Sequence, residues 1–206
     1  MQSEIESGSD GGVVSPPEAG VTRFLRYSHV LGSVLREILE DSFLRDRCGA
    51  RLNRMQLCSL KLVTLASGLR MGDLARCLGV SPAATSKNVD VLARQGLLLR
   101  REAPDDRRAT VLWATAEGRR LVEQYERLKA SRVVPVFESL SEDESEVLCD
   151  LLERVCAGLV EGCVPRGTCL RCTGYFHSSC AVAARQEGCV LRRHREQLTT
   201  EPRWRS

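Results

Sequence analysis

Apolar residues recur at intervals of three and four along much of the chain, which predicts a mainly helical protein. The first long amphipathic helix is expected from Thr22 to about Asp46. A second helix follows Asn53, whose side chain can cap it, and ends before Gly68. The apolar positions of the first helix are Phe24, Tyr27, Leu31, Val34, Leu35, Ile38 and Leu39.

Two further long helices are expected in the second half of the chain. One runs from Ala116 to about Val134, with Thr115 as its cap. The last begins at Ser141, a capping residue followed by three acids, and extends to about Gly162.

Between these long helices, residues 71–96 predict two short helices joined by a tight turn. Leu74 and Leu78 form the apolar side of the first short helix, and Gly79 is placed to end it. Ser81 can cap the second, which a proline opens and Gly96 ends. The inward positions of this second helix are Thr85, Val89 and Leu92, and its outer positions are Ala83, Ser86, Lys87, Asp90 and Arg94.

The sequence after Gly96 is typical of two strands. Residues 97–101 and 110–113 can pair, and the charged, turn-forming run 103–108 separates them. Two helices across a turn, followed by a hairpin with a basic tip, form a winged helix-turn-helix. The expected fold class is therefore mainly α with a small β-hairpin wing (α+β), between long N- and C-terminal helices.

Four segments in this order resemble the MarR family of bacterial transcription regulators. They are Leu74-Ala75-Arg76-Cys77-Leu78-Gly79-Val80-Ser81, Asp90-Val91-Leu92-Ala93-Arg94-Gln95-Gly96-Leu97, Pro104-Asp105-Asp106-Arg107-Arg108 and Thr115-Ala116-Glu117-Gly118. The resemblance covers about Thr22 to Gly162. It implies a homodimer held by the long N- and C-terminal dimerisation helices, and double-stranded DNA as partner. It also implies a small-molecule effector bound between the dimer helices and the DNA-binding lobe.

The second short helix is expected to read DNA. A recognition helix presents slim, polar side chains to base edges in the major groove, and its N-terminal end also holds phosphates. The alternative is an ordinary exposed helix face. The candidate DNA-contacting residues on this helix are Ser81, Ala83, Thr85, Ser86, Lys87, Asn88 and Arg94.

The wing supplies a second expected contact. Arg107 or Arg108 can enter a minor groove, where the negative potential attracts a guanidinium. Asp105 or Asp106 can brace that arginine by a bidentate pair. The resemblance makes Arg108 the inserted residue and Asp106 its brace, while Arg100 and Arg101 can follow the DNA backbone. Two wings require a dimer on a pseudo-palindromic site with half-sites about one helical turn apart. The alternative for this segment is a solvated turn.

Composition narrows the class of protein further. The chain has 206 residues with a formal net charge of +3, so its total charge alone does not indicate nucleic acid. The start lacks a basic and apolar leader, and no run of about 18 uncharged apolar residues occurs, so a cytoplasmic protein without a membrane span is expected. Ten cysteines are many for a reducing compartment and favour metal or redox chemistry over disulfides.

Five of the ten cysteines fall within residues 163–189. The expected ligands of a metal site are Cys169, Cys172, Cys180 and Cys189, with Cys163 or His177 as possible substitutes. An all-thiolate set suits zinc or an iron–sulfur cluster, and a sensor favours the cluster because zinc has no redox chemistry. A redox-active thiol cluster without metal and a small apolar core are the alternatives.

Three segments are therefore expected: a disordered acidic region 1–20, a regulator domain 21–162, and a cysteine-rich, basic tail 163–206. The tail carries eight arginines against three glutamates, which can add phosphate contacts or solvate the tail. The expected function is a DNA-binding regulator, a repressor in the first instance, with redox or metal sensing by the tail. The alternative is a zinc-stabilised interaction module. No catalytic constellation is recognisable, so an enzyme is not expected.

Overall fold

The computed structural model describes residues 16–48, 51–66, 68–103 and 106–163. The chain starts with one long helical rod made of α1 (Pro16–Val34), the π-helix η1 (Leu35–Asp41) and α2 (Ser42–Cys48). The rod follows the helical periodicity of the sequence, but it begins at Pro16 instead of Thr22. Residues 16–20, expected to be disordered, are therefore helical.

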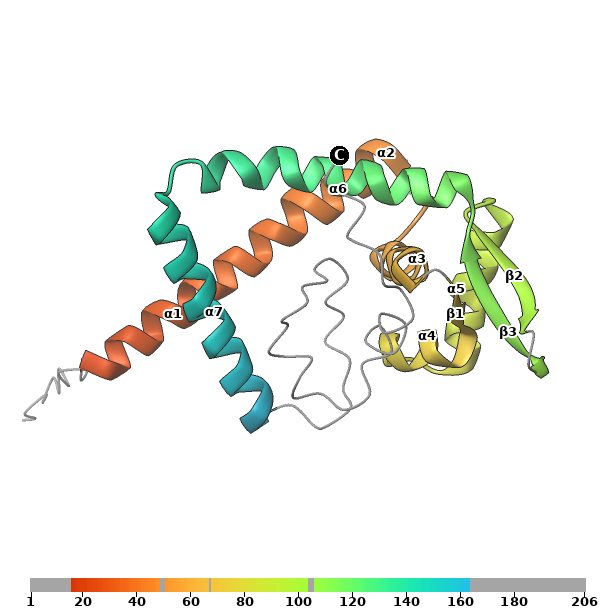
Figure 1. Ribbon diagram of the computed structural model, residues 1–206, viewed down its shortest axis with the longest axis horizontal. Coiled ribbons are helices and arrows are strands. Elements are labelled where there is room, and N and C mark those ends of the chain that lie inside the picture. The colour runs from red at the N-terminus through yellow and green to blue at the C-terminus, as the bar shows by residue number, and fades with distance from the viewer. Residues whose placement is uncertain (1–15, 49–50, 67, 104–105, 164–206) are drawn as a thin grey trace, which may run out of the picture.

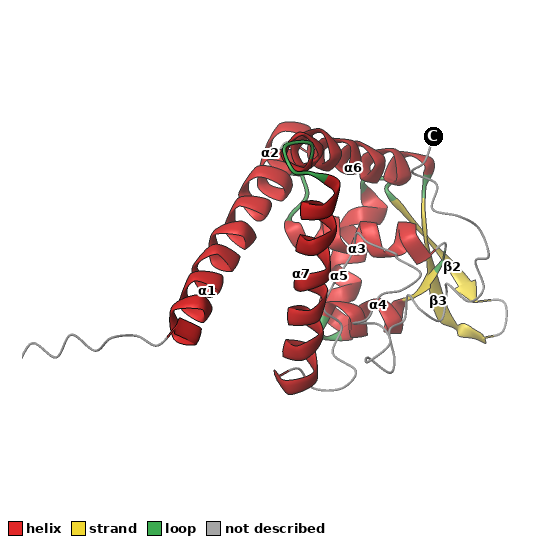
Figure 2. Cartoon of the chain, turned by 60° about the vertical axis from the view of Figure 1, so that its left-hand side comes forward, coloured by secondary structure: helices red, strands yellow, loops and turns green. Residues whose placement is uncertain are grey.

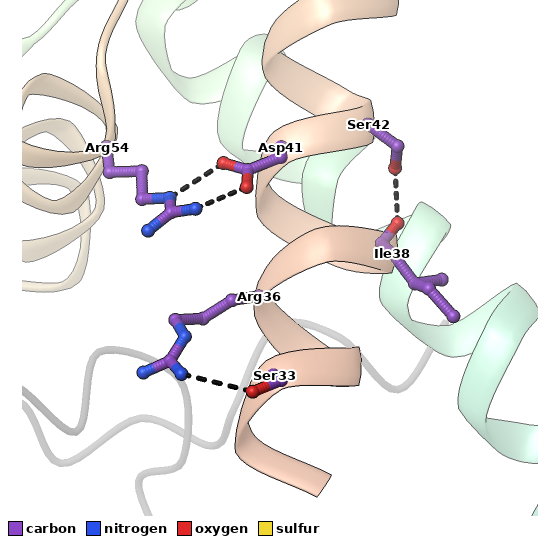
Figure 3. A network of polar contacts seen from close by, with 6 residues as sticks. All are labelled: Ser33, Arg36, Ile38, Asp41, Ser42 and Arg54. Atoms are coloured by element: carbon purple, nitrogen blue, oxygen red, sulfur yellow. Dashed lines mark hydrogen bonds and ion pairs between the residues drawn. The ribbon is translucent and has the colours of Figure 1, made fainter. Parts of the chain in front are cut away.

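The π-helix η1 lies where the rod meets the rest of the fold (Figure 3). The Arg54 guanidinium donates from Nε to Asp41 Oδ1 over 2.7 Å, and its Nη2 contacts the other carboxylate oxygen. The Ser42 hydroxyl donates to the Ile38 carbonyl within the same turn. The hydrogen bond from Arg54 holds the pKa of Asp41 below its ordinary value. This ion pair ties the rod to the start of the next helix.

The lobe that follows contains three helices and a small sheet (Figure 1). Its helices are α3 (Arg54–Ala66), α4 (Met71–Leu78) and α5 (Pro82–Arg94). Asn53 and Gln56 cap α3 reciprocally, with the Gln56 amide donating to Asn53 Oδ1 over 2.9 Å. The mainly α fold with a small β wing is thus as the sequence predicts.

The sheet has three antiparallel strands in the order β1-β3-β2: β1 (Leu69–Arg70), β2 (Leu98–Ala103) and β3 (Asp106–Ala114). The sequence predicted the β2–β3 hairpin but not β1, whose two residues are too few to show a pattern. The hairpin is also longer than expected, because β3 already includes residues 106–108. These residues were expected in the turn.

The buried core lies inside this lobe. Leucines from α3, α4, α5 and the strands are almost fully shielded from solvent, and Phe43 of α2 joins them. The largest fully buried side chains are Phe43, Leu57, Leu60, Leu62, Leu69, Leu74, Leu78, Leu92, Leu98 and Leu112. The core therefore fixes the recognition helix and the wing as one body.

Two long helices complete the described chain: α6 (Ala116–Phe137) and α7 (Glu142–Cys163). The Ser141 hydroxyl accepts from the Glu144 amide over 3.2 Å, and the Glu144 carboxylate accepts in return, which is the predicted capping box. Pro135 lies inside α6 and does not end it, because the helix runs two residues further.

The helices α1 and α7 are here called the arm helices. Figure 1 shows both of them to one side of the lobe, and Figure 2 shows α1 projecting away from it. Phe24 and Leu31 of α1 and Ile38 of the adjoining η1 recur every seven residues and are all at least one-third exposed. On α7, Val147, Leu151 and several neighbours are similarly exposed. The arm helices thus present apolar faces that this single chain leaves in contact with water.

Two lysines are buried where α6 crosses α3. Lys61 of α3 and Lys129 of α6 are only 5% and 7% exposed, and both ammonium groups lie over the ring of Tyr125, at 4.5 Å and 5.4 Å from its centroid. Glu126 pairs with Lys129. Burial lowers the pKa of Lys61, and the nearby charge of Lys129 lowers it further. The junction between lobe and α6 is therefore a polar contact inside an apolar core.

Candidate nucleic-acid interface

The recognition helix α5 is held at both ends by the residues that the sequence indicated. Gly79 ends α4 at a φ of 65°, a backbone setting that suits glycine. The Ser81 hydroxyl then accepts from the Ala84 amide over 3.2 Å, with a proline at the first helical position. At the other end, Gly96 adopts a φ of 71° as expected of the residue that stops the helix, and the Leu97 amide donates to the Leu92 carbonyl over 2.9 Å.

The outer edge of α5 is open to solvent at most of the expected DNA-contacting positions. Ala83, Lys87 and Arg94 are exposed, and Ser86 and Asn88 are half-buried. Thr85 is an exception: it is 0% exposed, and its hydroxyl donates to the Ser81 carbonyl over 3.1 Å. Thr85 therefore belongs to the core, as its inward periodicity indicated, and in this structure its side chain is not open to the DNA contact that was expected of it.

The wing projects beside this edge (Figure 1). Asp106, Arg107 and Arg108 begin β3, so their backbone is extended and antiparallel to the end of β2. A register irregularity between Glu102 and Ala103 marks the tip of the hairpin. The three residues thus lie at the far end of the wing, where the family resemblance expects a DNA-inserting arginine.

Arg100 was expected to follow the DNA backbone, but in this structure it contacts the recognition helix. Its Nη2 lies 2.7 Å from Asp90 Oδ1 and 3.2 Å from the Ser86 carbonyl oxygen. Asp90 itself was seen only as an outer position of α5. The alternation of side chains along β2 carries the signal that was missed, because Arg100 falls on the same side of the strand as buried Leu98.

The turn after the recognition helix is joined to the first turn of α6. The Thr115 hydroxyl donates to the Gly96 carbonyl over 2.7 Å and accepts from the Gly118 amide over 3.0 Å. A Cβ atom at Gly118 would lie 2.2 Å from the Leu97 carbonyl oxygen, so only glycine fits there. The Thr-x-x-Gly segment is thus a joint between the DNA-reading and the long C-terminal helices.

The described cysteines divide into two sets. Cys48 and Cys77 are buried and Cys58 is half-buried, in keeping with small core residues, and burial raises the pKa of the Cys48 thiol. Cys149, Cys156 and Cys163 are exposed along α7. Among the residues the structure describes, no group of three or more histidine, cysteine or acidic side chains is placed to hold a metal ion.

The predicted metal ligands lie almost wholly beyond this part of the chain. Cys169, Cys172, His177, Cys180 and Cys189 fall outside the described residues, and only Cys163, at the end of α7, is within them. Across the described helices, none is both long and apolar enough to span a bilayer.

An exposed helix edge beside a β-hairpin wing defines a winged helix-turn-helix protein. Residues 52–109 match the model of the MarR family. With the relatives described next, this makes the chain similar to MarR-family transcription regulators over that segment.

The curated relatives are named as regulators. The uncharacterized HTH-type transcriptional regulator YdgJ of Bacillus subtilis is 27% identical over 107 residues, which are 52% of this chain and 64% of that protein. The regulator YkoM of the same organism is 24% identical over 66% of this chain and 88% of its own length. The chain thus spans less than two thirds of YdgJ.

Solved structures share the fold. FabT of Streptococcus pneumoniae, crystallised in complex with DNA, superposes with a TM-score of 0.58 at 20% identity, over 67% of this chain and 98% of FabT. At that identity the likeness concerns the fold alone. It agrees with the arrangement of recognition helix, wing and long flanking helices described above.

Proposed function

We propose that this protein is a DNA-binding transcription regulator that grips a pseudo-palindromic duplex as a homodimer. The observation that carries the proposal is the open edge of α5 beside the basic wing, both fixed by one buried core. Slim side chains at Ala83 and Ser86 leave the helix room to approach base edges, and Lys87 adds positive charge there. Repression is the expected effect on transcription, because a bound dimer blocks access to its DNA site.

The exposed faces of the arm helices support the dimer. Large apolar side chains such as Tyr27 and Val147 are 61% and 56% exposed in the single chain, and their neighbours on α1 and α7 extend the patch. Contiguous apolar surface of this kind is typical of a protein–protein interface. A second copy would cover these faces and set two recognition helices about one DNA turn apart.

The test of DNA binding uses the wing. Arg108→Ala should weaken binding to a duplex selected by the wild-type protein by about tenfold to a hundredfold, as expected for one specific arginine contact. Arg127→Ala, which removes an exposed charge from α6, serves as the matched control. Fluorescence anisotropy measures the affinities, and sedimentation checks that the dimer persists. Equal affinities for the two variants would contradict the role of Arg108.

The same titration separates the alternative of an interaction module. A regulator should bind its selected duplex more tightly than a scrambled one, with a strong dependence on salt. A module that uses the winged helix for protein contacts should bind neither duplex. The identity of a small-molecule effector is open to the same assay, as a compound that releases the selected duplex.

We further propose that the tail senses metal or redox state through Cys169, Cys172, Cys180 and Cys189, as an iron–sulfur cluster or zinc site. Support comes from the density of thiols and from the position of Cys163, which ends α7 and links the tail to an arm helix. Oxygen-free purification with metal analysis and a visible spectrum tests this. A colourless protein without iron or zinc would overturn it.

A further inference from the structure

Resting on the DNA-binding function proposed above, we propose that Arg100 is a positioning residue for recognition. It fixes the rotation of α5 against the wing and screens the Asp90 carboxylate from the DNA. Arg100 thereby acts on the duplex through α5, and not as a contact to a phosphate.

The geometry of the guanidinium carries the first part of this role. One nitrogen, Nη2, reaches both the Asp90 carboxylate at 2.7 Å and the Ser86 carbonyl oxygen at 3.2 Å. These two residues are one helical turn apart, so the arginine straddles a turn of α5. Because both acceptor oxygens belong to α5 and Arg100 belongs to β2, a rotation of α5 about its axis would break this contact.

The strand gives the contact a rigid base. Arg100 pairs in register with Leu112 of β3, and its neighbour on the same strand face, Leu98, is buried in the core. Arg101 lies on the opposite face of β2 by strand alternation, although it carries the same charge. The contact therefore joins two elements, α5 and the wing, that must meet adjacent grooves of one duplex.

Charge carries the second part of the role. Asp90 is 50% exposed on a helix that faces a polyanion, and an unpaired carboxylate there would repel phosphates. The Arg100 side chain is 36% exposed, so the pair remains near the surface, where it adds little to folding. The pair should thus matter more for DNA binding than for stability.

A double-mutant cycle tests the proposal in the full-length dimer. Wild type, Arg100→Ala, Asp90→Ala and the double variant are titrated against a duplex selected by the wild type from a random pool, and against a scrambled duplex. The titrations span about 50 to 200 mM salt, where phosphate contacts show most clearly. Arg101→Ala, alone and combined with Asp90→Ala, is the matched control for the coupling, and thermal melts confirm that each variant folds.

The expected result is that the effect of Asp90→Ala on DNA affinity changes sign when Arg100 is also replaced. Arg100→Ala weakens binding to the selected duplex by about tenfold, within the range of coupled pairs, and the salt slope is nearly unchanged. In the wild-type background, Asp90→Ala weakens DNA binding or leaves it unchanged. In the Arg100→Ala background, the same substitution strengthens DNA binding by about threefold, because the exposed carboxylate is gone. Arg101→Ala shows no such coupling.

Additive effects of the two substitutions would overturn the proposal. In that case Arg100→Ala should also lower the salt slope by about 0.9, the mark of one lost phosphate contact. A wild-type protein that fails to prefer its selected duplex over the scrambled one gives a different result. That outcome would remove the DNA-binding function itself, and the role of Arg100 with it.

Discussion

The lobe and the arm helices use similar residues in opposite ways. In the lobe, leucines such as Leu60 and Leu74 are completely buried by the chain's own helices and strands. On α1 and α7, leucines such as Leu31 and Leu151 are half exposed. The comparison teaches that the lobe is complete as a folded unit, whereas the arm helices are complete only when a second surface covers them.

The substitution with the largest expected effect disrupts the exposed apolar face of an arm helix. Leu31→Glu places a carboxylate in the face that a second subunit should cover, and burying an unpaired charge costs several kcal/mol. Sedimentation should show a monomer, and DNA affinity should fall by about a hundredfold or more, since one half-site binds alone.

Leu99→Glu is the matched control, because Leu99 is exposed on the wing and lies apart from both arm helices. It should leave the dimer intact. If Leu31→Glu sediments like the wild type, the arm helices do not form the dimer.

The second-largest effect is expected from a substitution in the buried core of the lobe. Leu60→Ala empties space at a residue that is 0% exposed and should lower the free energy of unfolding by about 2–5 kcal/mol. Chemical denaturation measures the change. Leu151→Ala on α7 should show a loss that depends on protein concentration, because its contacts would come from another subunit. A concentration-dependent loss for Leu60→Ala would contradict the separation of the two regions.

A smaller effect is expected from a substitution at the junction between the lobe and α6. Lys61→Met should raise the free energy of unfolding by about 1 kcal/mol at neutral pH, since it removes a buried charge that Lys129 repels. Glu40, Cys58 and Glu126 also act on this charge, so the comparison is made as a difference between variant and wild type.

The pH dependence of that difference follows from the lowered pKa of Lys61. In the folded protein Lys61 releases its proton below the ordinary value of 10.5, so the wild type gains stability as pH rises between the two values. The advantage of Lys61→Met should be full below the folded pKa and gone above 10.5. An advantage that grows with pH would refute this account.

The smallest effect concerns the π-helix. Asp41→Asn removes the carboxylate that Arg54 binds and should lower the melting temperature slightly at neutral pH, as for other surface pairs. The pKa of Asp41 is depressed, so its contribution is present above the ordinary value of 3.8 and lost as pH falls through the folded value. Wild type and variant should therefore converge in acid. A gap that persists there would point to packing instead.

Local rules predicted helix ends both in the lobe and in the two long C-terminal helices. Gly79, Ser81, Thr115 and Ser141 each occupy the helix end that their chemistry favours, because capping depends on a few neighbouring atoms. The inward set on α5 also followed from spacing alone. These features are short-range, and a sequence carries them in full.

Features that depend on distant partners were missed. The strand β1 exists only because β3 pairs with it, and the Arg100–Asp90 contact joins residues from two elements. The π-helix likewise lies where the rod meets α3 through Arg54. Such contacts are set by tertiary packing, which periodicity does not report.

The joint at Thr115 has a mechanical consequence. A helix of 22 residues such as α6 is a rod of about 33 Å, and it starts at the turn that ends α5. Swinging such a rod by about 5° moves its tip by about 3 Å. In the proposed dimer, leverage of that size in each subunit would be enough to shift the spacing of the two recognition helices away from the pitch of a double helix.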